Sequence, residues 1–180
     1  MLEMKNVTYI YEDQTVALKD ISMDLSKGSC IGIIGSNGAG KSTLFLNITG
    51  VLRPKQGQIF YDEKPMKYDK ASLRELRKQV SIVFQDPDKQ IFFSKVYDDV
   101  AFALRNLGVD EKEINRRVNI ALASVGAKDF ADKPVHFLSH GQKKRVAIAG
   151  VIAMDSEIIF MDEPSAGLDP VATTQVEEII

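Results

Sequence analysis

The feature that most constrains the fold of this chain is the glycine-rich stretch GSNGAGKST at residues 35–43. Its spacing, G-x-x-x-x-G-K-[ST], is typical of a loop that joins a buried strand to a helix and wraps around phosphate groups. Residues 30–34 before it are apolar without alternation, as in a strand covered on both faces of a parallel sheet. Residues 41–49 after it have the pattern of a helix, which Gly50 would close. The sequence therefore predicts an α/β fold with a phosphate-binding loop.

The residue types of this loop suit phosphate chemistry. Glycines let backbone N–H groups turn toward phosphate oxygens, and the N-terminus of the following helix adds a positive field. Lys41 supplies a cation for the β- and γ-phosphates, and the Ser42 hydroxyl is a ligand for Mg²⁺. The predicted nucleotide-binding residues are Gly35, Ser36, Asn37, Gly38, Ala39, Gly40, Lys41, Ser42 and Thr43, and Lys41 is also a predicted catalytic residue.

A pair of acidic residues, Asp162 and Glu163, follows a second apolar run at residues 158–161. Such a run predicts a strand that ends at the C-terminal edge of the sheet, where ligands bind in open α/β folds. Asp162 is a predicted Mg²⁺ ligand, and Glu163 is the predicted general base that polarises the attacking water. Taken alone, the pair is more often a solvated strand end. The phosphate loop is what favours the catalytic interpretation.

The rest of the chain shows strand patterns at its N-terminus and helix patterns in its middle. Residues 21–26 alternate between apolar and polar, which predicts a half-buried antiparallel strand, and residues 2–11 are similar but less regular. Further strands are expected at residues 58–61 and 80–84. Two helical stripes, closed by Gly108 and Gly126 and separated by a capping-box pattern at Asp110 and Glu113, predict a helical segment of about residues 86–137. This segment is inserted between strands of the sheet.

Composition excludes several classes of protein. The 180 residues are 44% hydrophobic and 27% charged, which is ordinary globular composition and excludes a disordered or collagen-like chain. A net charge of -2 gives no sign of nucleic-acid binding driven by phosphate neutralisation. The single cysteine, Cys30, cannot form an internal disulfide, and its apolar surroundings predict burial in a protein of a reducing, cytosolic setting. The longest apolar run, residues 146–154, is shorter than the roughly 20 residues that span a bilayer.

The segment LSHGQ at residues 138–142 resembles the signature motif of ATP-binding-cassette (ABC) ATPases. Alone, Ser139 and Gln142 have capping-box spacing and would indicate only the start of a helix. Together with the phosphate loop, Gln85 after an apolar strand, the acidic pair and SAGLD at residues 165–169, the resemblance covers almost the whole chain in the family's order. Residues 85–92 and 142–150 are similar to the energy-coupling-factor branch, especially its cobalt-import ATPases.

This resemblance implies a P-loop core of the ABC ATPase type, with N-terminal antiparallel strands and an inserted helical subdomain, in one domain over residues 1–180 that is incomplete at its C-terminus. It also implies Mg²⁺-dependent hydrolysis of ATP that drives uptake of cobalt or a related metal or vitamin. The expected partners are a transmembrane coupling subunit, a substrate-binding membrane subunit and a second ATPase, either identical or paralogous, but no nucleic acid. The expected location is peripheral, at the cytoplasmic face of the cell membrane.

The resemblance also assigns roles to single residues. Tyr11 matches the position that stacks on adenine, for which the alternative is core packing. Gln85 matches a catalytic residue that senses Mg²⁺ and the attacking water and links the core to the helical insertion; it is expected as a metal ligand together with Ser42 and Asp162. In such a family two domains sandwich two ATP molecules. The residues that match the contacts across that interface are Ser139, Gly141, Gln142 and Asp169.

Two departures from the family pattern keep an alternative open. His140 replaces the first glycine of the commonest signature sequence and is expected to be a local packing or polar residue. The family's switch histidine follows a strand that would lie beyond Ile180, and His136 and His140 precede the acidic pair. The alternative function is therefore a nucleotide-binding truncated fragment with little or no ATPase activity. A GTPase is disfavoured because no Asn-Lys-x-Asp motif occurs, and a DNA-repair ATPase because residues 86–137 are too few for its coiled coil.

Overall fold

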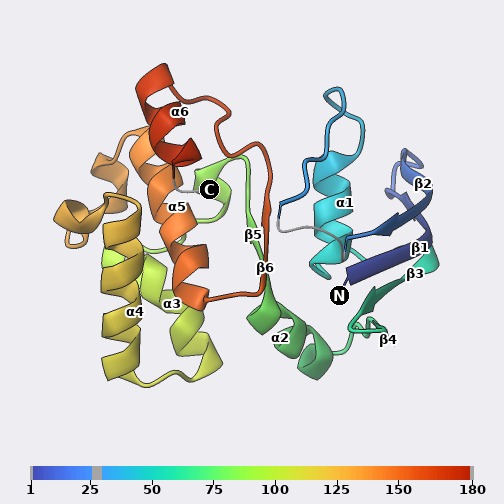
Figure 1. Cartoon of the computed structure of the whole chain (residues 1–180), viewed down its shortest axis with the longest axis horizontal. Coiled ribbons are helices and arrows are strands. Elements are labelled where there is room, and N and C mark those ends of the chain that lie inside the picture. Colours follow the sequence, from blue (N-terminus) through green and yellow to red (C-terminus); the bar gives the residue numbers. More distant parts are fainter. Residues whose placement is uncertain (1, 26–29, 179–180) are drawn as a thin grey trace. The chain divides into compact units, whose positions relative to one another are not determined.

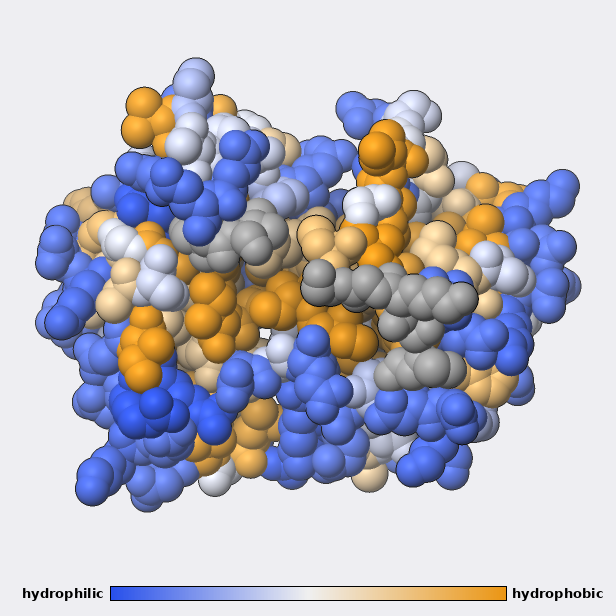
Figure 2. Space-filling model, viewed as in Figure 1, coloured by the Kyte–Doolittle hydropathy of each residue, from blue (hydrophilic) through white to orange (hydrophobic). Residues whose placement is uncertain are grey.

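The computed structural model describes residues 2–25 and 30–178 (Figure 1). The chain divides into two compact units, Met1–Arg77 and Lys78–Ile180. Of the described helices, none is long and apolar enough to cross a membrane. Both hydrophilic and apolar residues reach the face drawn in Figure 2, each in continuous areas.

The first unit is built on a four-stranded antiparallel sheet with the strand order β2-β1-β3-β4. The predicted N-terminal antiparallel strands are confirmed. Leu2, Met4 and Val7 of β1 are buried, and a bulge between Met4 and Val7 changes the strict alternation of that strand. Helix α1 adds its buried Leu44 and Ile48 to the unit's core. The elements are β1 (Leu2–Ile10), β2 (Val16–Asp24), α1 (Lys41–Ile48), β3 (Gln56–Tyr61), β4 (Lys64–Pro65) and α2 (Lys70–Gln79), which leads into the second unit.

One strand prediction is wrong in this structure. The residues after Cys30, up to the phosphate loop, form no strand, and the exposed fractions of Ile31 and Ile34 are 44% and 99%. Cys30 is exposed as well, which contradicts its predicted burial. The physical reason is that a parallel strand exists only through hydrogen bonds to neighbouring strands. Within the described residues, both sheets are formed without this segment, so its apolar side chains remain at the surface.

The second unit combines a two-stranded parallel sheet with a bundle of helices. Strands β5 and β6 pair in register from Val80 opposite Ile158 to Val83 opposite Met161, which confirms both predicted strands. The elements are β5 (Val80–Val83), α3 (Val96–Leu107), α4 (Glu111–Ser124), α5 (His140–Met154), β6 (Ile158–Met161) and α6 (Pro170–Glu177). Short 3₁₀ turns lie at Pro87–Lys89, Lys128–Phe130 and Val135–Phe137.

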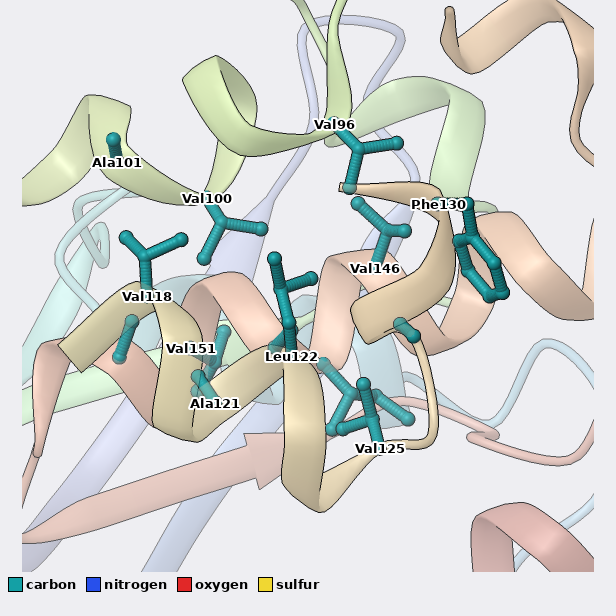
Figure 3. Packing of buried hydrophobic residues seen from close by; sticks show 14 of the residues in the cluster. Val96, Val100, Ala101, Val118, Ala121, Leu122, Val125, Phe130, Val146 and Val151 are labelled. Atoms are coloured by element: carbon teal, nitrogen blue, oxygen red, sulfur yellow. The ribbon is translucent and has the colours of Figure 1, made fainter. Parts of the chain in front are cut away.

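The helices of this unit form around the predicted apolar stripes. Val100 of α3, Leu122 of α4 and Val146 of α5 are each fully buried and belong to one cluster (Figure 3). Burying a side chain of this size stabilises a fold by about 1.5–3 kcal/mol. Helix α5 is buried along most of its surface, as expected of a helix with neighbours on several sides. The apolar period therefore determines both the helices and their packing.

The ends of α3 and α4 follow the sequence with one exception. Gly108 closes α3 in the left-handed conformation with φ 79°, where a side chain would be strained. Asp110 caps α4 by accepting a hydrogen bond from the backbone N–H of Lys112. The predicted capping box is incomplete, because the Glu113 carboxylate instead accepts hydrogen bonds from Arg116 and Arg117. A carboxylate forms a stronger hydrogen bond with a charged guanidinium than with a neutral backbone amide.

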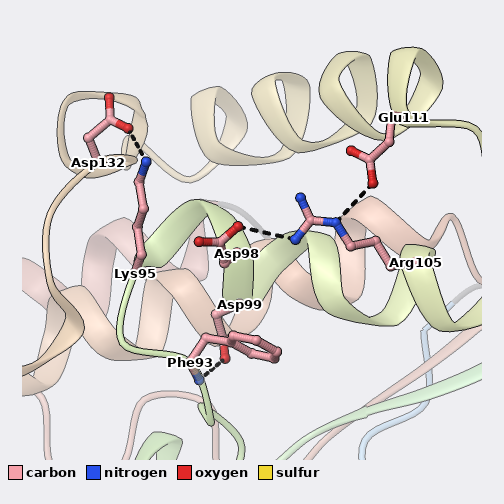
Figure 4. A network of polar contacts seen from close by, with 7 residues as sticks. All are labelled: Phe93, Lys95, Asp98, Asp99, Arg105, Glu111 and Asp132. Carbon is pink, nitrogen blue, oxygen red and sulfur yellow. Dashed lines mark hydrogen bonds and ion pairs between the residues drawn. The ribbon is translucent and has the colours of Figure 1, made fainter.

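Polar contacts stabilise the start of the helical segment (Figure 4). The carboxylate of Asp99 accepts hydrogen bonds from the backbone N–H groups of Phe92 and Phe93 at 2.8 and 3.0 Å. Burial raises the pKa of this carboxyl, against the opposite effect of those hydrogen bonds. Arg105 of α3 meanwhile bridges Asp98 and Glu111, which ties α3 to the start of α4.

Candidate functional site

The phosphate loop lies in the first unit, and the side chain of Lys41 bonds back to the start of the loop. The ammonium of Lys41 donates hydrogen bonds to the backbone carbonyls of Gly35 and Ser36 at 2.9 and 3.1 Å. Gly40 precedes α1 with φ 91°, and a Cβ there would lie 2.5 Å from the carbonyl oxygen of Ala17. Only glycine fits this position. The structure thus places an ammonium group against the loop at the N-terminus of a helix, an arrangement that suits an anionic phosphate.

Tyr11 lies beside this loop. Its hydroxyl is 2.9 Å from the Oγ1 of Thr43, the last residue of the loop motif, and either oxygen can donate that hydrogen bond. Its ring packs edge to face on Tyr9 at 5.0 Å, and 37% of the residue remains exposed. The alternative of a core tyrosine is therefore not what this structure shows. A partly exposed ring next to a phosphate loop suits the predicted stacking on a base.

The second unit brings Gln85 and Glu163 together. The side-chain N–H of Gln85 donates to a carboxylate oxygen of Glu163 at 2.9 Å. The β5–β6 pairing explains this contact, because the N–H of Asp162 donates to the carbonyl of Val83 and extends the ladder past the last paired residues. Asp162 is only 5% exposed, whereas Glu163 takes a left-handed conformation with φ 46°. The two neighbouring acidic residues therefore differ in backbone conformation and in burial.

A buried cation, Lys144, bonds the backbone of this pair and was not predicted from the sequence. Its side chain is fully buried, and its ammonium donates to the backbone carbonyls of Phe84 and Gln85 at 3.0 and 2.7 Å. The carbonyl of Glu163 lies 3.5 Å away. Burial lowers the pKa of Lys144, while the charge of Asp162 acts in the opposite direction. The missed signal is spacing: Lys144 stands four residues before the buried Ile148, on the same apolar face of its helix.

The signature-like segment forms the start of α5. Ser139 is the N-cap, and its hydroxyl accepts a hydrogen bond from the backbone N–H of Gln142 at 3.3 Å, while the Gln142 side chain accepts one from the N–H of Ser139 at 2.9 Å. This is the capping box that the spacing predicts. A Cβ on Gly141 would lie 3.2 Å from the Cβ of Ala172 on α6, so this turn is closely packed. Asp169 caps α6 through the backbone N–H of Ala172 at 2.9 Å.

The predicted Mg²⁺ ligands provide only oxygen atoms. Ser42 lies at the start of α1 in the first unit, whereas Gln85 and Asp162 follow β5 and β6 in the second. Hydroxyl, amide and carboxylate oxygens suit Mg²⁺, which proteins typically bind through one or two carboxylates together with substrate phosphates. The described residues contain no cluster of three His, Cys, Asp or Glu side chains that would favour another metal. The donor atoms of these side chains, considered within each unit, are therefore of the kind that Mg²⁺ prefers.

Comparison with known proteins gives a consistent result. The ABC transporter family model matches residues 18–166. A putative ABC transporter ATP-binding protein of Listeria monocytogenes is 56% identical over 180 residues, which cover 100% of this chain and 67% of the relative. An energy-coupling factor transporter ATP-binding protein of Methanocaldococcus jannaschii is 50% identical, with 100% and 64% covered. The chain thus spans about two thirds of the length of these relatives.

Solved structures that resemble this chain include the following two. CbiO1 from Clostridium perfringens, described as part of the ABC transporter complex cbiONQ, is 46% identical with a TM-score of 0.85, over 99% of this chain and 71% of that one. An ATP-binding cassette described as dimeric, in a post-hydrolysis state bound to ADP and Pi, is 28% identical with a TM-score of 0.89, over 99% and 81%. These matches confirm the predicted ABC ATPase fold with its N-terminal antiparallel strands.

Proposed function

Since the chain belongs to the ABC transporter family, we propose that it binds ATP with Mg²⁺ and hydrolyses it as the ATPase subunit of an importer. The observation that carries this proposal is the phosphate loop of residues 35–43, which curls around Lys41 at the N-terminus of α1. Tyr11 supports a nucleotide as the ligand, because it adds an aromatic ring that is hydrogen-bonded to the same loop. We further propose that the two units form one nucleotide-binding domain, with residues 86–137 as its helical subdomain.

The chain's own groups account for the steps of hydrolysis. The loop amides and Lys41 would hold the β- and γ-phosphates and compensate their charge. Ser42, Asp162 and Gln85 would hold Mg²⁺, which compensates the charge that develops on the phosphate oxygens. Glu163 would accept a proton from the attacking water, and the hydrogen bond from Gln85 orients the carboxylate for that transfer.

We propose that two copies, or this chain and a paralogue, bind ATP between them. Supporting this, the first turn of α5 presents a capped helix N-terminus at Ser139, and a similar cassette is described as a dimer. The test uses the full-length protein. Glu163→Gln should retain ATP and accumulate an ATP-dependent dimer in light scattering, and adding Ser139→Arg should abolish it. A monomer at high concentration with ATP would contradict self-pairing and would require a paralogous partner.

The proposed cargo is cobalt or a related metal or vitamin. Relatives named as energy-coupling factor and cobalt import ATP-binding proteins support this choice. The partners would be a transmembrane coupling subunit and a substrate-binding membrane subunit, with this chain peripheral at the cytoplasmic face. Nothing in the described residues or the comparisons favours the alternative of a fragment that does not hydrolyse ATP.

The import proposal is tested in vesicles that contain the full-length protein with its membrane subunits. Uptake of radioactive Co²⁺ should require ATP and should be lost with Lys41→Ala. Uptake that continues without ATP would contradict the energising role. For the nucleotide, ATP should displace a fluorescent ATP analogue, and Tyr11→Ala should weaken the binding of both, because stacking on Tyr11 is the proposed base contact.

A further inference from the structure

Helix α5 contains a buried cation, Lys144, to which the proposed mechanism assigns no role in phosphate binding or proton transfer. Lys144 is fully buried, although lysine is almost never buried without a partner. Its nearest partners are uncharged backbone carbonyls of two separate segments. Phe84 and Gln85 belong to the segment after β5, and Glu163 to the segment after β6. A buried ammonium requires several hydrogen bonds to offset its desolvation, and an ammonium has three N–H donors, the number of carbonyls present here.

Two of these carbonyls belong to the proposed catalytic residues, Gln85 and Glu163. Gln85 and Glu163 are the residues whose side chains bind each other at 2.9 Å, and Lys144 binds the backbone of both. It therefore holds the two main chains relative to each other through their carbonyls, while a separate hydrogen bond joins the two side chains. Gln90 strengthens the same attachment, because it accepts from the N–H of Phe84 and donates to the carbonyl of Ala147 on α5.

The same helix is capped at its N-terminus by Ser139, so one helix connects the signature-like turn with the backbone of Gln85 and Glu163. We propose that Lys144 is a positioning residue that holds Gln85 and Glu163 in the geometry needed for ATP hydrolysis; this inference rests on the proposed function. Lys144 does not itself contact the reacting atoms in this scheme. Its effect passes through the backbone carbonyls of the two residues that do.

The test compares Lys144→Met with Lys143→Met in the full-length protein. Both variants remove one positive charge from α5. Lys143, however, pairs with the exposed carboxylate of Asp88 and not with backbone of the site. For Lys144→Met we expect kcat to fall about 10- to 100-fold with little change in KM for ATP, because small misplacements of catalytic groups have effects of this size. Lys143→Met should keep native kcat and KM.

A second measurement needs neither nucleotide nor turnover. Amide hydrogen exchange of the nucleotide-free protein should accelerate in peptides that cover residues 84–90 in Lys144→Met, and should stay native in Lys143→Met. Lys144→Gln, which keeps two N–H donors without the charge, should recover part of the lost kcat and protection. If Lys144→Met itself folds poorly, this glutamine variant serves as the test, with an intermediate loss expected in both readouts.

The outcomes separate the two proposals. Lower thermal stability with native kcat would show that Lys144 is only structural and would overturn the inference, as would a raised KM with native kcat. Native exchange at residues 84–90 would also overturn it. If the native protein hydrolyses no ATP, the proposed function is wrong, and the exchange experiment alone then decides whether Lys144 fixes this segment.

Discussion

Replacing Lys41 with alanine should weaken ATP binding by a predictable amount. In the structure the Lys41 ammonium donates two hydrogen bonds to loop carbonyls, at 2.9 Å to Gly35 and 3.1 Å to Ser36. A bound nucleotide would offer the same ammonium charged phosphate oxygens. Hydrogen bonds that involve a charged group contribute about 1.5–3 kcal/mol. Since about 1.4 kcal/mol corresponds to a tenfold change in affinity, Lys41→Ala should raise the Kd for Mg·ATP about 10- to 100-fold.

The assay is a titration of the full-length protein with a fluorescent ATP analogue, followed by displacement with ATP. Lys19→Ala is the matched control, because Lys19 is an exposed lysine of β2 in the same unit and its removal changes the net charge equally. Lys41→Arg tests geometry, because it keeps the charge but not the compact ammonium. An unchanged Kd in Lys41→Ala, with Lys19→Ala also native, would refute the assignment of this loop as the phosphate site.

Three further predictions concern Tyr11, the core of the second unit and its response to acid. Tyr11→Ala should raise the Kd for ATP about tenfold, because it removes a stacking contact of about 1–3 kcal/mol. Tyr11→Phe keeps the ring and should retain most of the native affinity in the same titration. Leu122→Ala should lower the free energy of unfolding by about 2–5 kcal/mol in denaturant titrations, because this side chain is fully buried. Hydrogen bonds from Arg116 and then Arg117 lower the pKa of Glu113 from 4.5 to about 2. The resulting stabilisation should be complete above pH 4.5 and lost as the pH falls toward 2, and Glu113→Gln should remove this part of the acid dependence in thermal melts.

Local patterns predicted most of the elements that carry the site. The phosphate loop, β6 and the helices around Leu122 each depend on residues close together in the sequence, so spacing and capping residues were sufficient to identify them. The contact of Gln85 with Glu163 was not predicted from the sequence; the structure explains it, because both residues follow strands of one parallel pair. Gln85 after β5 and Glu163 after β6, for which the sequence predicts separate roles, are hydrogen-bonded to each other in this structure.

Non-local pairing explains what the sequence did not predict. Residues 30–34 have the apolar character of a central strand, but strand formation requires neighbours, and sequence character alone does not supply them. Lys144 was missed for a related reason. Its partners are backbone carbonyls, which carry no sequence signal, so only its place on a buried helix face hinted at a role. The capping pattern likewise did not predict that the Glu113 carboxylate would bond Arg116 and not a backbone amide.

The central claim, that this chain belongs to an enzyme that hydrolyses ATP with Glu163 as the base, is tested most directly by turnover of the full-length Glu163→Gln protein. Its steady-state ATPase rate should fall about 10²- to 10⁴-fold, the usual contribution of a general base. The Kd for ATP should stay native, because phosphate binding is assigned to the loop around Lys41. Glu177→Gln, an exposed change on α6, should leave both values unchanged. Native turnover in Glu163→Gln would contradict the account.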